Sequence, residues 1–138
     1  MTGAAHDNAS RPAPRDVAHA MMRAMEKKDY AAALSFISDD CEYENMPMGK
    51  VQGADGVRAV LEPFFEPTLA NELKVQHEAS AGPLLFMERL DRHQLADRWV
   101  ELPVTSVMEV EAGKIVRWRE YWDSATLARQ WPGLLPGT

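Results

Sequence analysis

Apolar residues follow two different spacings along the chain, and the change falls near its middle. In the first half they recur every three to four residues, as they do on one face of an amphipathic helix. Helices are therefore predicted over residues 16–29, 30–37 and 53–65. Asp16 and Asp29 stand where the first two of these helices need an N-cap.

In the second half apolar and polar residues alternate, which is typical of strands with one buried face. Strands are predicted over residues 73–80, 83–94, 99–111 and 114–123. The segments between the last three are short enough for hairpin turns, so these strands should pair antiparallel. A strand carrying Tyr43 and Asn45 is expected before the third helix, and Asp123 is expected to cap a short helix over 124–130. The pattern favours an α+β fold in which a curved sheet wraps over helices and leaves a conical cavity.

Length and composition narrow the class of protein. A chain of 138 residues with 46% hydrophobic and 26% charged residues is expected to form one domain, over residues 16–132, between tails at 1–15 and 133–138. A net charge of −6 argues against a nucleic-acid surface. No apolar run is long enough to span a membrane, and the N-terminal segment lacks the features of a secretory signal. Cys41 is the only cysteine, which fits a reducing compartment, so the cytoplasm is the expected location.

Polar residues at two-residue steps mark a candidate site on the strands. Side chains two apart on a strand point the same way, so Arg89 and Asp91 share a face. Glu120 stands between Trp118 and Trp122 on one face of the last strand. An arginine between the two acids would couple their titration. The alternative interpretations are a surface ion pair and a solvated edge carboxylate, both of low energetic value.

Three segments together resemble a known family. "YENMPMG", "ERLD" and "GKIVRWREYWD" are similar in order and spacing to the limonene-1,2-epoxide hydrolase family, from about Asp16 to Pro132. The resemblance implies a cone-shaped, mixed but mostly antiparallel sheet packed on N-terminal helices. This is the NTF2-like or cystatin-like α+β barrel, shared with ketosteroid isomerase and the SnoaL-type polyketide cyclases. It also implies a homodimer formed through the outer face of the sheet, and no organic cofactor.

The resemblance also implies a role for each polar residue of the candidate site. Tyr43 and Asn45 match the residues that hold a water, and Arg89 and Asp91 match the pair that protonates the epoxide oxygen. Glu120 stands where the family has the aspartate that deprotonates the water, and this is the main departure from the family pattern. The substrate would be a small apolar epoxide. Its expected pocket is lined by Met46, Met48, Leu85, Trp118 and Trp122.

The sequence gives less support for metal binding or for catalysis by a nucleophilic serine. The four histidines show no paired spacing of metal ligands, so no metal site is expected. No serine lies in a G-x-S-x-G context, which argues against a nucleophilic serine. Two alternatives to epoxide hydrolysis stay open. One is an isomerase or cyclase that uses the same carboxylates for proton transfer, and the other is a non-catalytic protein of the same fold that binds apolar ligands.

Overall fold

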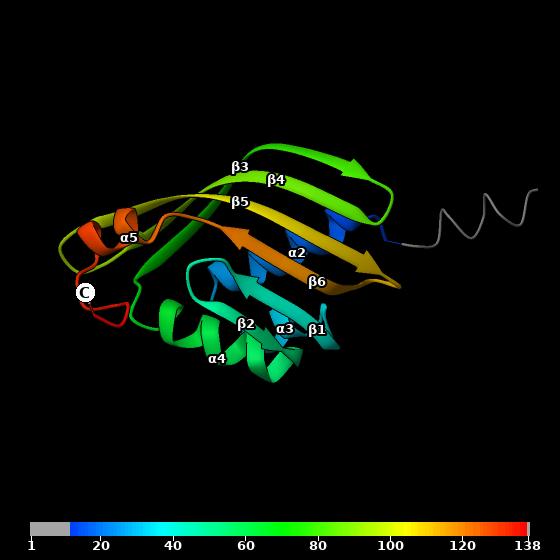
Figure 1. Ribbon diagram of the computed structural model, residues 1–138, viewed down its shortest axis with the longest axis horizontal. Helices are drawn as coiled ribbons and strands as arrows, with labels where there is room; N and C mark the ends of the chain where they lie inside the picture. The colour runs from blue at the N-terminus through cyan, green and yellow to red at the C-terminus, as the bar shows by residue number, and fades with distance from the viewer. Residues whose placement is uncertain (1–11, 138) are drawn as a thin grey trace, which may run out of the picture.

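The helices form close to the predicted ranges, but the second helix ends at Leu34 and not at residue 37, because Ile37 begins a strand. In the computed structural model, which describes residues 12–137, they are α2 (Pro14–Glu26), α3 (Tyr30–Leu34), α4 (Gly53–Phe65) and α5 (Ser124–Gln130) (Figure 1). The Asp29 and Asp123 side chains accept hydrogen bonds from the backbone N–H groups of Ala32 and Thr126, so both predicted caps are confirmed.

The start of α2 differs from the prediction. Its N-cap is Ala13, with Pro14 at the first helical position, so Asp16 is not a cap and lies within the first turn. Proline suits that position because its fixed φ fits a helix and its missing N–H would have no partner there. A carboxylate in the first turn still interacts favourably with the helix dipole.

The strands form one six-stranded mixed sheet. They are β1 (Ile37–Asn45), β2 (Gly49–Gln52), β3 (Ala70–Ala81), β4 (Leu84–Gln94), β5 (Trp99–Glu111) and β6 (Lys114–Tyr121). Their order in the sheet is β2-β1-β6-β5-β4-β3, in which β1 and β6 pair parallel and every other pair is antiparallel. The predicted α+β class with a curved, mostly antiparallel sheet is confirmed. Strand β2 is an addition, a short edge strand that the sequence pattern did not indicate.

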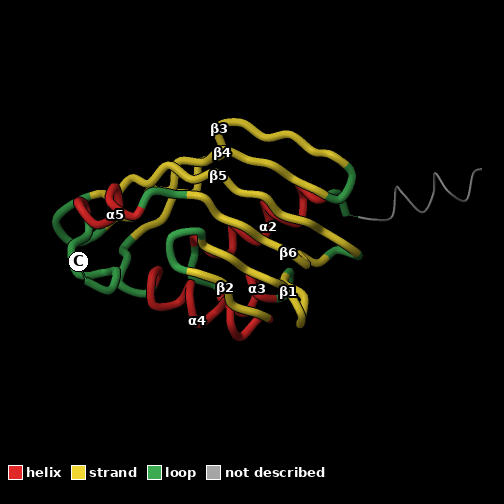
Figure 2. Tube along the Cα trace, viewed as in Figure 1, coloured by secondary structure: helices red, strands yellow, loops and turns green. Residues whose placement is uncertain are grey.

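The helices lie against one face of this sheet. Figure 2 shows α2 crossing behind the strands and α4 running below β1 and β2. The α2 side chains of Met21, Met22 and Met25 are buried in the main core, between this helix and the concave face of the sheet. A second cluster joins the first half of β5 to α5 and includes Val100 and Leu127. The sheet and the helices therefore enclose an apolar interior that extends to α5 and to the segment that follows it.

A β-bulge changes which residues of β6 face inward. Val110 pairs with Ile115 and Glu109 pairs with Arg117, so Val116 is the extra residue of the bulge. The alternation predicted Val116 on the face of Trp118, whereas Ile115 is fully buried and Val116 is not. An inserted residue reverses the alternation on one side of itself, which a regular pattern cannot show.

The ends of the folded part differ from the predicted tails. Pro14 and Arg15 belong to α2, inside the predicted tail at 1–15, of which residues 1–11 lie outside the described part of the chain. Leu134 and Leu135, in the predicted tail at 133–138, pack against the second core cluster. Within residues 12–137 no helix combines the length and the hydropathy that crossing a membrane requires.

Candidate active site

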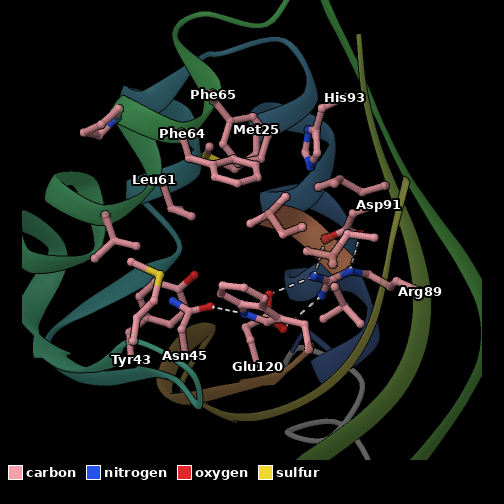
Figure 3. A pocket seen from close by; sticks show the side chains of 18 of the residues that line it. Met25, Tyr43, Asn45, Leu61, Phe64, Phe65, Arg89, Asp91, His93 and Glu120 are labelled. Carbon is pink, nitrogen blue, oxygen red and sulfur yellow. Dashed lines mark hydrogen bonds and ion pairs between the residues drawn. The ribbon is translucent and has the colours of Figure 1, made fainter. Parts of the chain in front are cut away.

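One guanidinium joins two carboxylates in the interior of the sheet (Figure 3). Nε and Nη2 of Arg89 donate to the two oxygens of Asp91, each over 2.9 Å. Nη2 and Nη1 donate to Oε1 and Oε2 of Glu120 over 2.7 and 3.3 Å. All three residues are buried, with Arg89 only 3% exposed. The surface-pair interpretation is therefore wrong for these residues.

The register of three neighbouring strands brings these side chains together. Arg89 and Asp91 lie on β4 and Glu120 lies on β6, with β5 between them. Arg89 pairs with Val104 and Glu120 pairs with Ser106, so the guanidinium spans the width of β5. Ser106 stands between Met87 and Glu120 in the register.

The charge balance of the array is one cation against two acids. Burial alone would lower the pKa of Arg89, but the charges of Asp91 and Glu120 and their hydrogen bonds raise it well above its ordinary value. Arg89 therefore stays protonated. With both acids ionised the buried array would carry a net charge of −1, and one bound proton would make it neutral.

Tyr43 and Asn45 reach the same site from β1. The parallel pairing places Tyr43 beside Trp118 and Asn45 beside Glu120. The Tyr43 ring stacks on the Trp118 ring at a centroid distance of 4.2 Å. Burial, and then the charge of Glu120, raise the pKa of Tyr43, so the phenol keeps its proton and can act as a donor.

The orientation of the Asn45 amide follows from its hydrogen bond. Nε1 of Trp122 donates to Oδ1 of Asn45 over 2.9 Å. The indole can only donate, so the oxygen of the amide must face it and the NH₂ group is left as a donor toward the site. The Asn45 side chain also hydrogen-bonds the Tyr43 phenol, and Asn45 pairs with Glu120 in the register, so both polar side chains lie close to this carboxylate. This arrangement can hold the oxygen of a water while the carboxylate accepts its proton.

A cavity of about 270 Å³ opens onto these residues, near the lower end of the range for small-molecule sites. Tyr43, Asn45, Arg89, Asp91 and Glu120 all line it. The remaining wall is mostly apolar, as Figure 3 shows around Leu61 and Phe64. The structure therefore brings the five predicted polar residues to one cavity.

The predicted pocket residues divide into two groups. Met48, Trp118 and Trp122 line the cavity, but Met46 and Leu85 do not. Leu85 lies near the start of β4, where it is fully buried in the main core. Met46 is in the turn after β1 and is 38% exposed. The prediction was wrong for Met46 and Leu85. A residue's nearness in sequence to the site and its face of the strand do not say how far along the cavity its side chain lies.

Sequence reasoning missed much of the cavity wall. The wall also includes residues of α2, α4, β4, α5 and the C-terminal segment, among them Met25, Leu61, Phe64, Phe65, His93, Leu127, Leu134 and Leu135. The inward helical faces were visible as apolar spacing, but that spacing cannot separate core from cavity. His93 had a signal, because it shares the alternating face of Arg89 and Asp91.

The described part of the chain contains no cluster of side chains suited to bind a metal ion. Within residues 12–137 no three side chains of His, Cys, Asp or Glu are grouped so that they could hold a metal ion. The polar side chains among the residues that line the cavity provide one guanidinium, two carboxylates, a phenol, an amide, an imidazole and two indole N–H groups.

Comparison with known proteins agrees with this geometry. The chain is 26% identical over 118 residues to the epoxide hydrolase EphG of Mycobacterium tuberculosis, which covers 86% of this chain and 76% of that protein. The solved structure of an LEH-like epoxide hydrolase from M. tuberculosis superimposes with a TM-score of 0.71 at 24% identity, over 82% of this chain and 84% of that one.

The same fold occurs in proteins assigned to other chemistry. A structure from Shewanella denitrificans, assigned as a SnoaL-like polyketide cyclase, has a TM-score of 0.76 at 17% identity, over 87% of this chain and 97% of that one. At this identity the likeness concerns the fold. The family model of the limonene-1,2-epoxide hydrolase catalytic domain, in contrast, matches residues 12–133, nearly the whole chain. The chain therefore belongs to the limonene-1,2-epoxide hydrolase family.

Proposed function

We propose that the protein hydrolyses a medium-sized apolar epoxide, of the limonene-1,2-epoxide kind, to a vicinal diol. The observation that carries the proposal is the buried array in which Arg89 bridges Asp91 and Glu120, beside Tyr43 and Asn45 in the wall of an apolar cavity. Family membership supports epoxide hydrolysis in general. Opening an epoxide needs a nucleophile behind one carbon and a proton for the departing oxygen, and two acids with separate roles supply both.

The reaction proceeds in one step by direct attack of water. Tyr43 and Asn45 donate hydrogen bonds to the water oxygen, and Glu120 takes one of its protons. The water oxygen bonds to one epoxide carbon while the bond from that carbon to the epoxide oxygen breaks. Asp91 gives its proton to that oxygen, so the product is a neutral diol. No covalent intermediate forms and no cofactor takes part.

Arg89 separates the roles of the two acids. It holds both carboxyl groups in fixed positions through four hydrogen bonds. The proposed cycle starts with a proton on Asp91 and with Glu120 ionised. Turnover leaves the proton on Glu120 and the negative charge on Asp91. The net charge of the array is unchanged by the reaction, so the buried site never holds an uncompensated charge.

The proposal is tested by following diol formation from terpene, cyclohexene and styrene epoxides in ¹⁸O-water. Wild type is expected to place label in the diol on the first turnover, because water attacks carbon directly. Asp91→Asn should lose activity by more than about 10²-fold, since it removes the general acid. Glu120→Asp should lose about 10²-fold, because it withdraws the base by ~1 Å.

The controls separate failure of the chemistry from failure of the protein. Glu111→Asp shortens an exposed carboxylate of β5 and should leave the rate unchanged. An active family member is assayed beside the protein. If wild type converts no epoxide while that enzyme does, epoxide hydrolysis is wrong and the isomerase, cyclase and binding alternatives take its place. First-turnover diol without label would instead indicate a covalent intermediate on a carboxylate.

We also propose that the protein is a cytoplasmic homodimer that pairs through the outer face of the sheet. Phe86, Trp99 and Tyr121 are exposed on that face, each more than a third exposed. Val107 lies opposite Phe86 in the register but is only 8% exposed, so it contributes little to this apolar surface. The buried, unpaired Cys41 supports a reducing compartment.

A further inference from the structure

His93 is a polar side chain of the cavity wall that the proposed reaction does not use. It follows Asp91 by two residues on β4 and shares its face, so the two side chains lie in succession along the cavity (Figure 3). Phe64 and Phe65 meet its ring edge to face, at centroid distances of 4.8 and 5.3 Å. The side chain is 1% exposed and is held by packing as well as by hydrogen bonds.

A buried chain of hydrogen bonds fixes the proton on this imidazole. The Thr68 hydroxyl donates to the carbonyl of Phe65 over 2.6 Å, so its oxygen accepts from Nδ2 of Asn71 over 2.8 Å. Oδ1 of Asn71 then faces Nδ1 of His93 over 2.7 Å. An amide oxygen can only accept, so the proton is on Nδ1. In the neutral ring Nε2 is left with a lone pair.

Nε2 has no partner among the residues that the structure describes, and the ring lines the cavity. Burial lowers the pKa of His93 to about 4, with the nearby Asp91 acting in the opposite direction. The ring is therefore neutral near pH 7, and Nε2 is an acceptor there. A neutral imidazole with this pKa is a poor proton donor, so a role in returning a proton to Asp91 does not fit.

We infer that Nε2 of His93 accepts a hydrogen bond from a hydroxyl group on the substrate. The preferred substrate is then an epoxide with an apolar body that carries one hydroxyl a few bonds from the ring. The inference rests on the proposed function, because it concerns the substrate of the same cavity. Two residues along a strand correspond to about 6–7 Å, which sets the distance between the reacting oxygen at Asp91 and the hydroxyl at His93.

The physical reason is the cost of an unpaired buried acceptor. A substrate without the hydroxyl displaces water from Nε2 and makes no hydrogen bond to replace it. This loss costs about 1–3 kcal/mol, or roughly 10- to 100-fold in affinity. A substrate with the hydroxyl restores the bond. Selection against an analogue that lacks a hydrogen-bonding group is stronger than selection against an analogue that lacks one methylene.

The test compares two epoxides that differ only by a hydroxyl, the 1,2-epoxides of α-terpineol and of p-menth-1-ene. The measured quantity is the ratio of their kcat/KM values. We expect His93→Leu to lower the ratio by roughly 10- to 100-fold, because the hydroxylated substrate loses its partner and the other substrate no longer leaves Nε2 unpaired. His77→Leu is the matched control, because the His77 side chain is 84% exposed at the edge of the sheet. His93→Met is a second apolar replacement should His93→Leu fail to fold.

The outcomes distinguish this inference from the proposed function. A ratio that is the same in wild type and in the folded His93 variant overturns the inference and leaves epoxide hydrolysis standing. If neither epoxide is hydrolysed, the proposed function fails, and calorimetry with α-terpineol and p-menth-1-ene then tests the hydroxyl contact without turnover. Tighter binding of the alcohol that is lost in His93→Leu but kept in His77→Leu supports the contact.

Discussion

Single residues of the site were predicted where the alternation of a strand is regular. Arg89 and Asp91 lie two apart on β4, in a stretch whose register with β5 has no interruption. Their common face was therefore visible in the sequence, and so was that of His93. The contact with Glu120 was only a hypothesis, because alternation gives the face of a strand and does not say which strands are neighbours.

His93 also makes the stability of the protein depend on pH. Its pKa is about 4 in the folded state, against 6.5 for an ordinary histidine. Between pH 4 and pH 6.5 the unfolded chain binds more protons than the folded chain. The contribution of the neutral His93 to the free energy of unfolding is therefore complete above pH 6.5 and is lost as the pH falls toward 4. At pH 5 the loss is about 2 kcal/mol.

Urea unfolding at pH 7.5 and pH 5 checks the effect in wild type, His93→Leu and His77→Leu. Between the two pH values His93→Leu should lose about 2 kcal/mol less of its unfolding free energy than wild type. His77→Leu should behave as wild type, because that ring is exposed. Equal losses in wild type and His93→Leu would contradict a depressed pKa for the buried imidazole.

At the scale of elements, types and bounds were predicted better than irregularities. The ranges predicted for α4, β5 and α5 match the structure, since a helical or alternating pattern runs through each without interruption. The bulge at Val116 and the edge strand β2 were missed. A bulge changes the backbone geometry at a single residue, which an alternating pattern does not reveal. Strand β2 forms because it pairs with β1, although the pattern of its own residues does not indicate a strand.

The turn from β2 into α4 depends on Gly53. Its φ is +78°, and an added Cβ would lie 2.8 Å from the carbonyl oxygen of Asp39. Gly53→Ala therefore combines left-handed strain, about 1–2 kcal/mol, with a clash against backbone. Gly82 is the matched control, with φ of +59° and nothing within 4 Å of the added atom.

Thermal and urea unfolding of the two variants separates these effects. Gly82→Ala should lose about 1 kcal/mol, and Gly53→Ala about 2–4 kcal/mol, the excess being the cost of moving α4 or β1. Because α4 carries Leu61 and Phe64 of the cavity wall, its displacement should also raise KM for epoxides. Equal losses in the two variants would show that the backbone at Asp39 yields without cost.

At the scale of the whole molecule, the fold class was predictable and the cavity wall was not. The order of helices and alternating strands indicates an α+β sheet that covers helices. The wall, however, combines α2, α4 and the segment after α5, and their meeting depends on tertiary packing. Leu134 and Leu135 show the limit well, since two leucines between a glycine and a proline carry no periodic signal.

The quaternary proposal concerns the outer face of the sheet. Phe86→Arg places a charge in the exposed apolar surface of this face, and we expect it to convert the protein to a monomer of 15.5 kDa. Sedimentation equilibrium measures the mass directly. Leu69→Arg is the control, because Leu69 is 67% exposed but precedes β3 and lies off this face. A wild type that sediments at 15.5 kDa would refute the dimer.

The parallel pairing of β1 with β6 has a consequence for how the protein is made. Asn45 meets Trp122, 77 residues further along the chain, and that loop must close before the contact forms. Contacts of long sequence separation form slowly. A growing chain on the ribosome therefore has its water-holding residues long before it has Glu120. The two halves of the site can meet only after β6 and Trp122 have been synthesised.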